Sequence, residues 1–236
     1  MKTSNTVWVI ALIIFIFLGS MELMLWKQYN KTMEEKAAGT ATVTDAPKSN
    51  ILYEENHDAV TDTSTADVPD THKYIFVGDS RYVAMSECAE AYDVFFCENG
   101  VGLYFLKNRM DKIVEASDDN TRIIIGLGVN DASAGNAGYI DAIMELCQRT
   151  DAEVYYMLVN PVSDAACSAN GYSLTNATID RFNTSMIEGL NDTEVKIIDT
   201  NTYLMSNGYS TFDGLHYDDE TTEKIYNFIK LCIRNQ

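Results

Sequence analysis

Three residue types that cooperate in nucleophilic catalysis occur at two separate places in this sequence. Ser80 ends the tripeptide Gly-Asp-Ser, directly after the apolar run 74–77, and Asp213 precedes His216 by three residues near the C-terminus. A serine becomes a strong nucleophile when a histidine takes its proton and a carboxylate orients that histidine. The two places together predict a nucleophile, a base and an orienting carboxylate.

The three histidines of the chain narrow the choice of base. His57 and His72 lie in a polar stretch that reads as a linker, whereas His216 lies in the part with globular patterning. We therefore expect His216 to be the only histidine of the folded part and the only candidate base.

Each catalytic segment has a plainer structural interpretation. Asp79 and Ser80 could simply cap a helix, and Asp213 with His216 could be a helix cap beside a surface histidine. In the catalytic reading, Gly78 permits a tight turn that lifts Ser80 to the start of a helix, where backbone N–H groups can stabilise an oxyanion. Tyr82 stands where a G-x-S-x-G elbow needs its second glycine, so that elbow is excluded.

Two glycine-containing segments could supply further oxyanion donors. Asn130 lies in the run Gly-Leu-Gly-Val-Asn-Asp at 126–131, and Gly102 ends the run Asn-Gly-Val-Gly at 99–102. An asparagine amide or a backbone N–H at such positions can hold a developing oxyanion. Both runs also have the composition of ordinary turns.

The elements that must position these residues alternate between short apolar runs and longer amphipathic ones. This alternation predicts βαβ units and a three-layer α/β/α sandwich of flavodoxin-like type, with five parallel strands. Active residues of such folds lie at the carboxyl ends of strands. The predicted strands are 74–77, 93–97, 122–127, 153–159 and 195–199, and the predicted helices are about 81–91, 103–116, 139–149, 179–190 and 219–234.

The first 29 residues predict a membrane anchor, because no charged residue occurs from Thr3 to Met21. Trp8 and Trp26 are about 27 Å apart on a helix, which matches the two aromatic belts of a bilayer. A cleaved secretory signal is the alternative, although Leu18 is too bulky for its cleavage site. Lys2 alone precedes the span, whereas three lysines follow it, so charge does not favour an external C-terminus.

Residues 30–71 have a polar composition that cannot bury enough apolar surface to fold. They predict a flexible linker that holds the domain at 72–236 away from an external membrane surface. The apolar patch Ile51-Leu52-Tyr53 is expected to make only a transient contact.

The four segments taken together resemble the GDSL/SGNH-type hydrolases, whose sequence blocks carry Ser, Gly, Asn and His. Ser80, Gly102, Asn130 and His216 match these blocks, and Asp213 matches the D-x-x-H position. The wording of the blocks is similar to that of membrane-anchored or secreted members from Gram-positive bacteria. The resemblance implies a Ser80-His216-Asp213 triad, with the Ser80 N–H, the Gly102 N–H and the Asn130 amide as oxyanion hole.

Two positions depart from a simple match to this family. Gly100 could occupy the second block with a small shift, in place of Gly102. Arg81 stands where many members have leucine, and it is expected to be a solvated residue of the first helical turn rather than to face substrate. The loop at 160–178 is expected to shape the acyl or sugar pocket.

The resemblance implies ester hydrolysis. The predicted anchor and linker, together with the absence of a long apolar insertion, lead us to expect short-chain esters, with acetyl esters of cell-wall or extracellular carbohydrate as the substrates. Transfer of acetyl to a polysaccharide hydroxyl, or an anchored carbohydrate-binding module without turnover, are the alternatives. A formal net charge of −18 argues against nucleic acid as a partner. The five cysteines show no C-x-x-C spacing, and neither a metal nor a cofactor is expected.

Overall fold

The structure is a computed structural model in which residues 50–52 and 70–236 are described. The predicted anchor at 1–29 and most of the predicted linker at 30–71 lie outside these residues, as does His57. Within the described ranges, no helix is both long enough and apolar enough to cross a membrane. The anchor and the linker therefore stay predictions.

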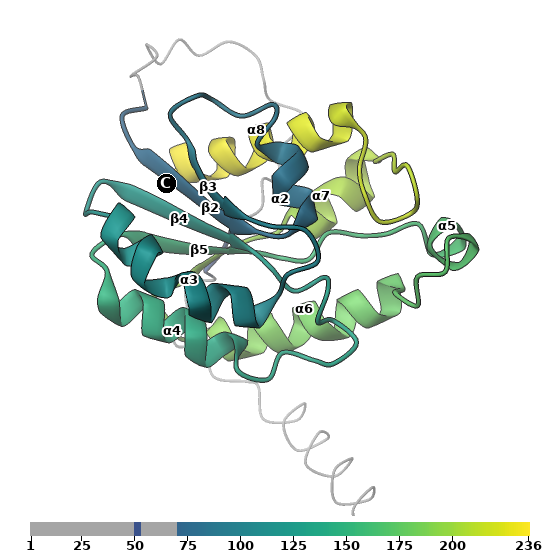
Figure 1. Ribbon diagram of the computed structural model, residues 1–236, viewed down its shortest axis with the longest axis horizontal. Helices are drawn as coiled ribbons and strands as arrows, with labels where there is room; N and C mark the ends of the chain where they lie inside the picture. Colours follow the sequence, from purple (N-terminus) through teal and green to yellow (C-terminus); the bar gives the residue numbers. More distant parts are fainter. Residues whose placement is uncertain (1–49, 53–69) are drawn as a thin grey trace, which may run out of the picture. The chain divides into compact units, whose positions relative to one another are not determined.

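One parallel sheet of six strands forms the centre of the fold (Figure 1). From one edge to the other, the strands are β1 (Ile51–Leu52), β6 (Lys196–Ile198), β5 (Glu153–Met157), β4 (Thr121–Gly126), β2 (Lys73–Gly78) and β3 (Val94–Cys97). The central strand β2 ends with Gly78 in register with Gly126 of β4 and Cys97 of β3. The carboxyl ends of β2, β3 and β4 therefore lie side by side at one end of the sheet.

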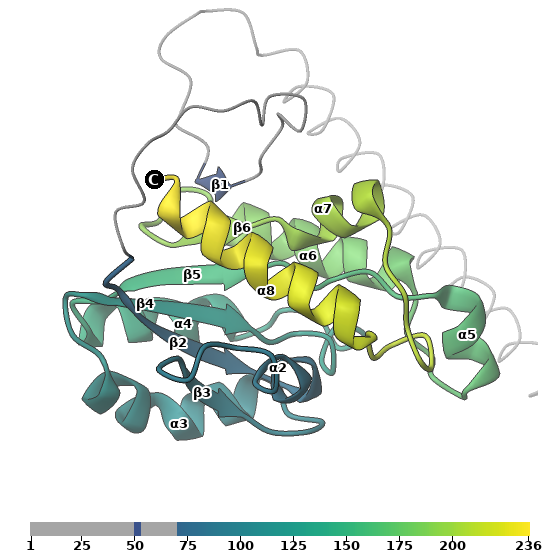
Figure 2. The same ribbon diagram turned by 90° about the horizontal axis from the view of Figure 1, so that it is seen from above.

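Helices cover both faces of the sheet and complete the predicted three layers (Figures 1 and 2). One face is covered by α3 (Leu103–Ala116), α4 (Tyr139–Arg149) and α6 (Asn176–Leu190). The other is covered by α2 (Ser80–Met85), α7 (Thr200–Asn207) and α8 (Asp219–Arg234). A short helix, α5 (Asp164–Ala169), follows β5. The predicted class, a flavodoxin-like sandwich around a parallel sheet, is confirmed.

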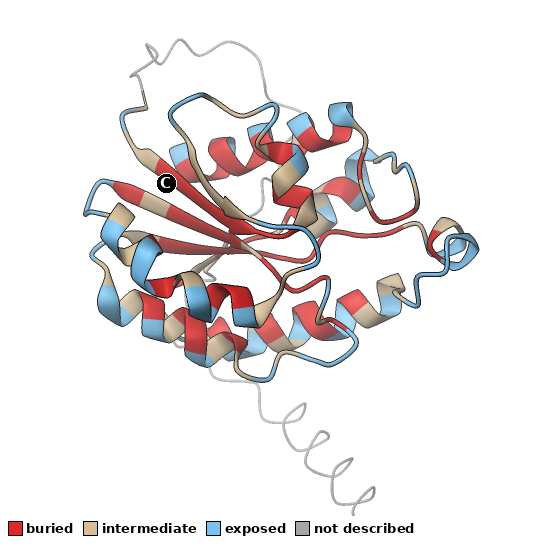
Figure 3. Ribbon diagram, in the orientation of Figure 1, coloured by how far each residue is buried: buried red, intermediate tan, exposed pale blue. Residues whose placement is uncertain are grey.

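The side chains of β2 contribute to two hydrophobic cores, one on each face of the sheet. Ile75 and Val77 point into the core beneath α3, α4 and α6, whereas Tyr74 and Phe76 point into the core beneath α2, α7 and α8. Successive side chains of a strand face opposite sides of the sheet, so an unbroken apolar run is needed here. Figure 3 shows the same pattern as central strands that are buried along most of their length.

The sixth strand corrects two expectations about the polar segment before the domain. Ile51 and Leu52 pair in parallel with Ile197 and Ile198 of β6, so the expectation of a merely transient contact is wrong. The side-chain amide of Asn50 reinforces this edge by donating to the carbonyls of Leu190 at 2.9 Å and Val195 at 2.7 Å. The sheet therefore has six strands rather than five, and its edge strand comes from within the predicted linker.

Three of the five predicted helices, α3, α4 and α8, have the predicted bounds, and α6 begins three residues earlier than predicted. Two differences concern short or polar helices. α2 ends at Met85 instead of about residue 91, and α5 and α7 were not predicted. Six or eight residues give too few turns for an apolar stripe to stand out.

His72 is part of the folded unit, contrary to expectation. Its Nδ1 lies 2.8 Å from Asp70 Oδ1, and its Nε2 lies 3.0 Å from the guanidinium of Arg122. It precedes β2, however, and so lies at the amino end of the sheet, whereas Ser80 follows β2 at the carboxyl end. His216 remains the one described histidine at the same end as Ser80.

Candidate active site

Ser80 is the first residue of α2 and follows the end of β2 by two positions. Asp79 caps the helix, since its Oδ1 accepts a hydrogen bond from the N–H of Arg81 at 3.0 Å. Gly78 does not adopt a positive φ, so its backbone conformation does not by itself require glycine. A Cβ on Gly78 would lie 2.3 Å from the ring of Tyr82, which means that glycine is required for close packing beneath the serine.

The structure brings Ser80, His216 and Asp213 into one hydrogen-bonded chain. Ser80 Oγ lies 3.0 Å from His216 Nε2, and His216 Nδ1 lies 2.8 Å from Asp213 Oδ2. With the proton on Nδ1, the ring donates to Asp213 and leaves Nε2 free to accept the serine proton. This is the order of contacts that a serine nucleophile requires.

Asp213 is held by four hydrogen bonds at the turn that carries His216. The backbone N–H groups of Leu215 and His216 donate to Oδ1 at 2.9 and 2.8 Å, and the hydroxyl of Tyr172 donates to Oδ2 at 2.9 Å. Burial alone would raise the pKa of this carboxyl, but the hydrogen bonds from His216, Leu215 and Tyr172 outweigh it and hold the pKa well below its usual range. The carboxylate is therefore charged whenever His216 needs a negative partner.

The Asp213 turn is packed tightly against α5. Gly214 has a φ of +97°, and a Cβ there would lie 2.3 Å from the backbone nitrogen of Cys167. The carbonyl of Gly214 accepts a hydrogen bond from Ser163 N–H at 2.9 Å. Glycine at this position lets the D-x-x-H turn and the loop after β5 approach each other closely.

Asn130 and Gly100 line the same cleft as Ser80 and His216. The side-chain amide of Asn130 donates to the carbonyl of Val101 at 2.8 Å, which fixes its orientation and leaves its second N–H without that restraint. Gly102 does not line this cleft but the neighbouring hollow. Of the two glycines weighed from the sequence, Gly100 is thus the one that borders Ser80.

Position 102 requires a glycine because the carboxylate of Asp131 packs against its backbone. A Cβ on Gly102 would lie 2.0 Å from Asp131 Oδ2. The same oxygen accepts hydrogen bonds from Leu103 N–H at 2.8 Å and from the hydroxyl of Tyr139 at 2.7 Å. Asp131 therefore anchors the start of α3 and the loop that carries Gly100.

The cleft around Ser80 has a volume of about 600 Å³ and is open to solvent. Its walls combine polar groups with apolar side chains. The lining residues are Ser80, Val83, Ala84, Glu87, Asn99, Gly100, Asn130, Tyr172, Leu215 and His216. The cleft contains the hydrogen-bonded serine and histidine at its surface, where a substrate can reach them.

Arg81 is buried, so the expectation of a solvated first-turn residue is wrong. Its side chain turns away from the cleft, with Nη1 donating to the carbonyl of Asn160 at 3.2 Å and Cζ lying 5.1 Å from the ring centre of Tyr217. Only 8% of the residue is exposed. The position next to Ser80 is therefore occupied by a buried cation.

Tyr172 and Tyr217 are the residues of this site that sequence reasoning missed. Tyr172 lies within the loop 160–178, which is expected to shape the pocket, and it is the one aromatic residue of that segment. Tyr217 follows His216 directly, and this adjacency is the one signal that could have singled it out. The partners of both tyrosines are set by tertiary contacts.

The sequence leaves open whether Cys88 and Cys97 form a disulfide, and in the structure both are free thiols. No group of three or more metal-ligating side chains occurs among the described residues. The groups brought together at the site are a hydroxyl, an imidazole, a carboxylate and an amide.

Comparison with known proteins gives a match in structure but not in sequence. No family model and no curated protein matches the chain. A lipase/acylhydrolase from Enterococcus faecalis is similar in structure, with a TM-score of 0.52 and 14% identity over 69% of this chain and 96% of the other. A member of the lipolytic protein G-D-S-L family from Veillonella parvula has a TM-score of 0.51 and 15% identity over 66% of this chain and 95% of the other.

The chain thus has the fold of the GDSL/SGNH hydrolases, and the resemblance predicted from the sequence blocks is confirmed at the level of the fold. The matched structures are covered almost completely, so the described domain corresponds to the whole of each of them. At these identities the likeness concerns the fold, and the chemistry has to be argued from the residues of this chain.

Proposed function

We propose that this protein is a serine esterase that removes short acyl groups through an acyl-enzyme. The observation that carries the proposal is the chain of hydrogen bonds from Ser80 Oγ through His216 to Asp213, which opens onto a solvent-accessible cleft. The GDSL/SGNH fold supports it.

In the proposed reaction, Ser80 Oγ attacks the ester carbonyl while His216 Nε2 takes the serine proton. Asp213, through Oδ2, keeps the imidazole in the required tautomer and stabilises its positive charge. The proton then passes to the leaving alcohol. A water molecule activated by His216 releases the acyl group and restores Ser80.

The tetrahedral intermediate carries a negative charge that needs donors. We assign this role to the N–H of Ser80, which as the first residue of α2 has no acceptor within the helix, and to the side-chain amide of Asn130. The third predicted donor was the N–H of Gly102, with Gly100 as the alternative. Gly100 is favoured, because it borders the cleft that contains Ser80.

A short acyl group, with acetyl as the first candidate, fits the shape of the cleft. The aliphatic side chains that line it are those of Val83, Ala84 and Leu215, and the cleft is open rather than tunnel-like. A fatty acyl chain would need a longer apolar channel to leave water. We further propose an acetylated carbohydrate outside the cell as substrate, on the basis of the anchor and linker expected from the sequence.

Acetyl transfer to a sugar hydroxyl is the second candidate function. A cleft of about 600 Å³ holds an acetyl group with room left for an acceptor. The same acyl-enzyme would then be resolved by an alcohol instead of water. Faster release of product when a soluble oligosaccharide is added would favour transfer over hydrolysis.

The test is ester hydrolysis by the full-length chain with p-nitrophenyl acetate, butyrate and octanoate. Ser80→Ala and His216→Ala are expected to lower kcat about 10⁴-fold or more. Matched controls are Ser185→Ala on α6 and His72→Ala at the amino end of the sheet, which are expected to retain activity. Equal rates on acetate and octanoate would contradict the short-acyl assignment. Full activity in Ser80→Ala would contradict the mechanism.

A further inference from the structure

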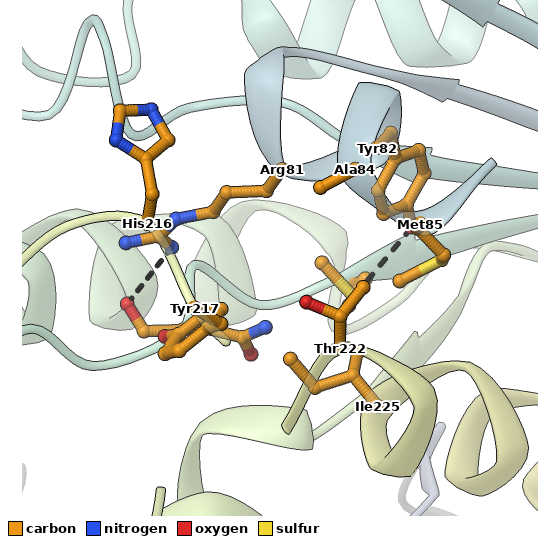
Figure 4. Close-up of a pocket in the computed structure, with 10 residues that line it drawn as sticks. Arg81, Tyr82, Ala84, Met85, His216, Tyr217, Thr222 and Ile225 are labelled. Carbon is orange, nitrogen blue, oxygen red and sulfur yellow. Dashed lines mark hydrogen bonds between the residues drawn. The ribbon is translucent and has the colours of Figure 1, made fainter. Parts of the chain in front are cut away.

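The guanidinium of Arg81 is a buried cation with few partners (Figure 4). Its Nη1 donates one hydrogen bond, to the carbonyl of Asn160, whereas Nε and Nη2 have no hydrogen-bond partner among the described residues. It also makes no salt bridge within residues 50–52 and 70–236. Burying a cation without a paired anion is costly. The stability of the fold alone gives no reason for an arginine here.

The position of Arg81 relates it directly to the proposed catalytic pair. Arg81 follows Ser80, and Tyr217 follows His216. The contact of the Arg81 guanidinium with the Tyr217 ring, at 5.1 Å, therefore joins the same two segments as the contact between Ser80 Oγ and His216 Nε2, at 3.0 Å. A cation over an aromatic face is attracted to it, and the attraction is stronger away from water.

A third segment ties these two contacts together. The carbonyl of Asn160 accepts from Arg81 Nη1 at 3.2 Å, and the neighbouring carbonyl of Pro161 accepts from the Tyr217 hydroxyl at 2.5 Å. Asn160 is itself buried and bonded through Oδ1 to the hydroxyl of Thr200, at the start of α7. The loop after β5 thus binds both the segment that carries Ser80 and the segment that carries His216.

We propose that Arg81 is a positioning residue that sets the distance and orientation between Ser80 and His216 by binding Tyr217 and Asn160. The proposal rests on the esterase function proposed above. Arg81 is absent from the lining of the substrate cleft, so it acts through Tyr217 and the backbone rather than on the substrate. An error of about 1 Å in the placement of such groups can cost about 100-fold in rate.

The experiment compares Arg81→Met and Arg81→Lys with the wild-type, full-length chain. Arg81→Met is expected to lower kcat by about 10- to 100-fold with KM within about twofold. It is expected to leave the unfolding temperature equal or higher, because a costly buried charge is removed. Arg81→Lys keeps a cation near the ring and is expected to recover part of kcat. Arg181→Met, on the exposed face of α6, is the control and is expected to behave as wild type.

Tyr217→Phe gives a second test that does not depend on Arg81→Met folding well. It keeps the aromatic ring and removes only the hydrogen bond to Pro161, so we expect a smaller loss of kcat than in Arg81→Met. A merely structural role would instead lower the unfolding temperature of both variants and leave the kcat of the folded protein unchanged. Wild-type kcat in Arg81→Met would overturn the proposal.

Two further measurements separate this proposal from the proposed function. One is the rate at which a fluorophosphonate labels Ser80; the Oγ–P bond forms, fluoride leaves and the serine proton passes to His216. The other is the NMR signal of the His216 ring protons. If the wild type were inert towards esters, the esterase assignment would fail, yet slower labelling and altered ring signals in Arg81→Met would still support positioning by Arg81. Unchanged labelling and unchanged ring signals would overturn it.

Discussion

At the amino end of the sheet, the ammonium group of Lys230 lies 2.8 Å from Glu90 and 3.1 Å from Asp93, whereas at the carboxyl end the guanidinium of Arg81 pairs with no described carboxylate. Both cations are buried, with 3% and 8% of the residue exposed. Lys230 also lies 3.6 Å from the ring centre of Tyr74. One buried charge is neutralised by its neighbours and the other is not.

A carboxylate at each of these two ends shows the same difference in how far its hydrogen bonds are satisfied. At the amino end, Asp70 accepts hydrogen bonds from Arg234 at 3.1 Å, from His72 and from Tyr74. At the carboxyl end, Asp79 Oδ2 is buried and has no hydrogen-bond partner within the described part of the chain. Burial raises the pKa of the Asp79 carboxyl against the attraction of Arg81. The charged groups Lys230 and Asp70 at the amino end thus have charged partners, whereas Arg81 and Asp79 at the carboxyl end keep buried polar atoms without a hydrogen-bond partner among the described residues.

If the carboxyl end of the sheet carries the activity, the largest loss of kcat is expected for Asp213→Asn, which alters that end. An asparagine can still accept the backbone hydrogen bonds of Leu215 and His216 but cannot balance an imidazolium. We expect kcat to fall about 10³-fold or more. The unfolding temperature is expected to fall as well, because the folded state lowers the pKa of Asp213 and so gains stability from its charge. Asp180→Asn on the exposed face of α6 is the control. A large loss of stability without loss of kcat would reverse the roles assigned to the two ends.

Lys230→Met is the complementary change at the amino end. It leaves the buried carboxylate of Asp93, whose side chain is 0% exposed, without its cation. We expect the free energy of unfolding to fall by about 3–5 kcal/mol in urea titrations, and kcat of the folded protein to stay unchanged. Lys224→Met, on the same helix, serves as control. A stability equal to that of wild type would show that the amino end does not depend on this pair.

Tyr172→Phe sharpens the account of the carboxyl end. It removes one of the four hydrogen bonds to Asp213 and leaves the contact with His216 in place. A hydrogen bond to a charged group contributes about 1.5–3 kcal/mol, but only part of this acts on the transition state, so we expect kcat to fall about 10-fold or less. An unchanged kcat would remove Tyr172 from the set of residues that orient Asp213.

A smaller effect is expected for acid stability at the amino end. Burial would raise the pKa of Asp70, but hydrogen bonds from Tyr74, His72 and Arg234 hold it well below its usual range. Because the folded pKa lies below the unfolded value of about 3.9, its contribution is complete above that pH and is lost as pH falls through the folded pKa. Asp70→Asn should therefore be less stable than wild type at pH 6, and the difference should shrink towards pH 2. A constant difference would contradict this linkage.

The sequence predicts what depends on local pattern. The helices α3, α4 and α8 have clear apolar periodicity. The segments that carry Ser80, Gly102 and Asn130 each follow a strand, so their meeting at the carboxyl end of the sheet could be expected. His216 follows α7 instead, and its place beside Ser80 is set by tertiary contacts. The pairing of Ile51 with β6 could not, because a two-residue strand has no period and its partner lies almost 150 positions away. The burial of Arg81 likewise depends on Asn160 and Tyr217, which are distant in sequence.

The most direct test of the central claim is fluorophosphonate labelling of the full-length chain, followed by intact-mass measurement and peptide mapping. The account predicts a single adduct on the peptide that contains Ser80, lost in Ser80→Ala and formed far more slowly in His216→Ala. Labelling of another serine, or equal labelling rates in wild type and His216→Ala, would contradict a nucleophile at Ser80 activated by His216.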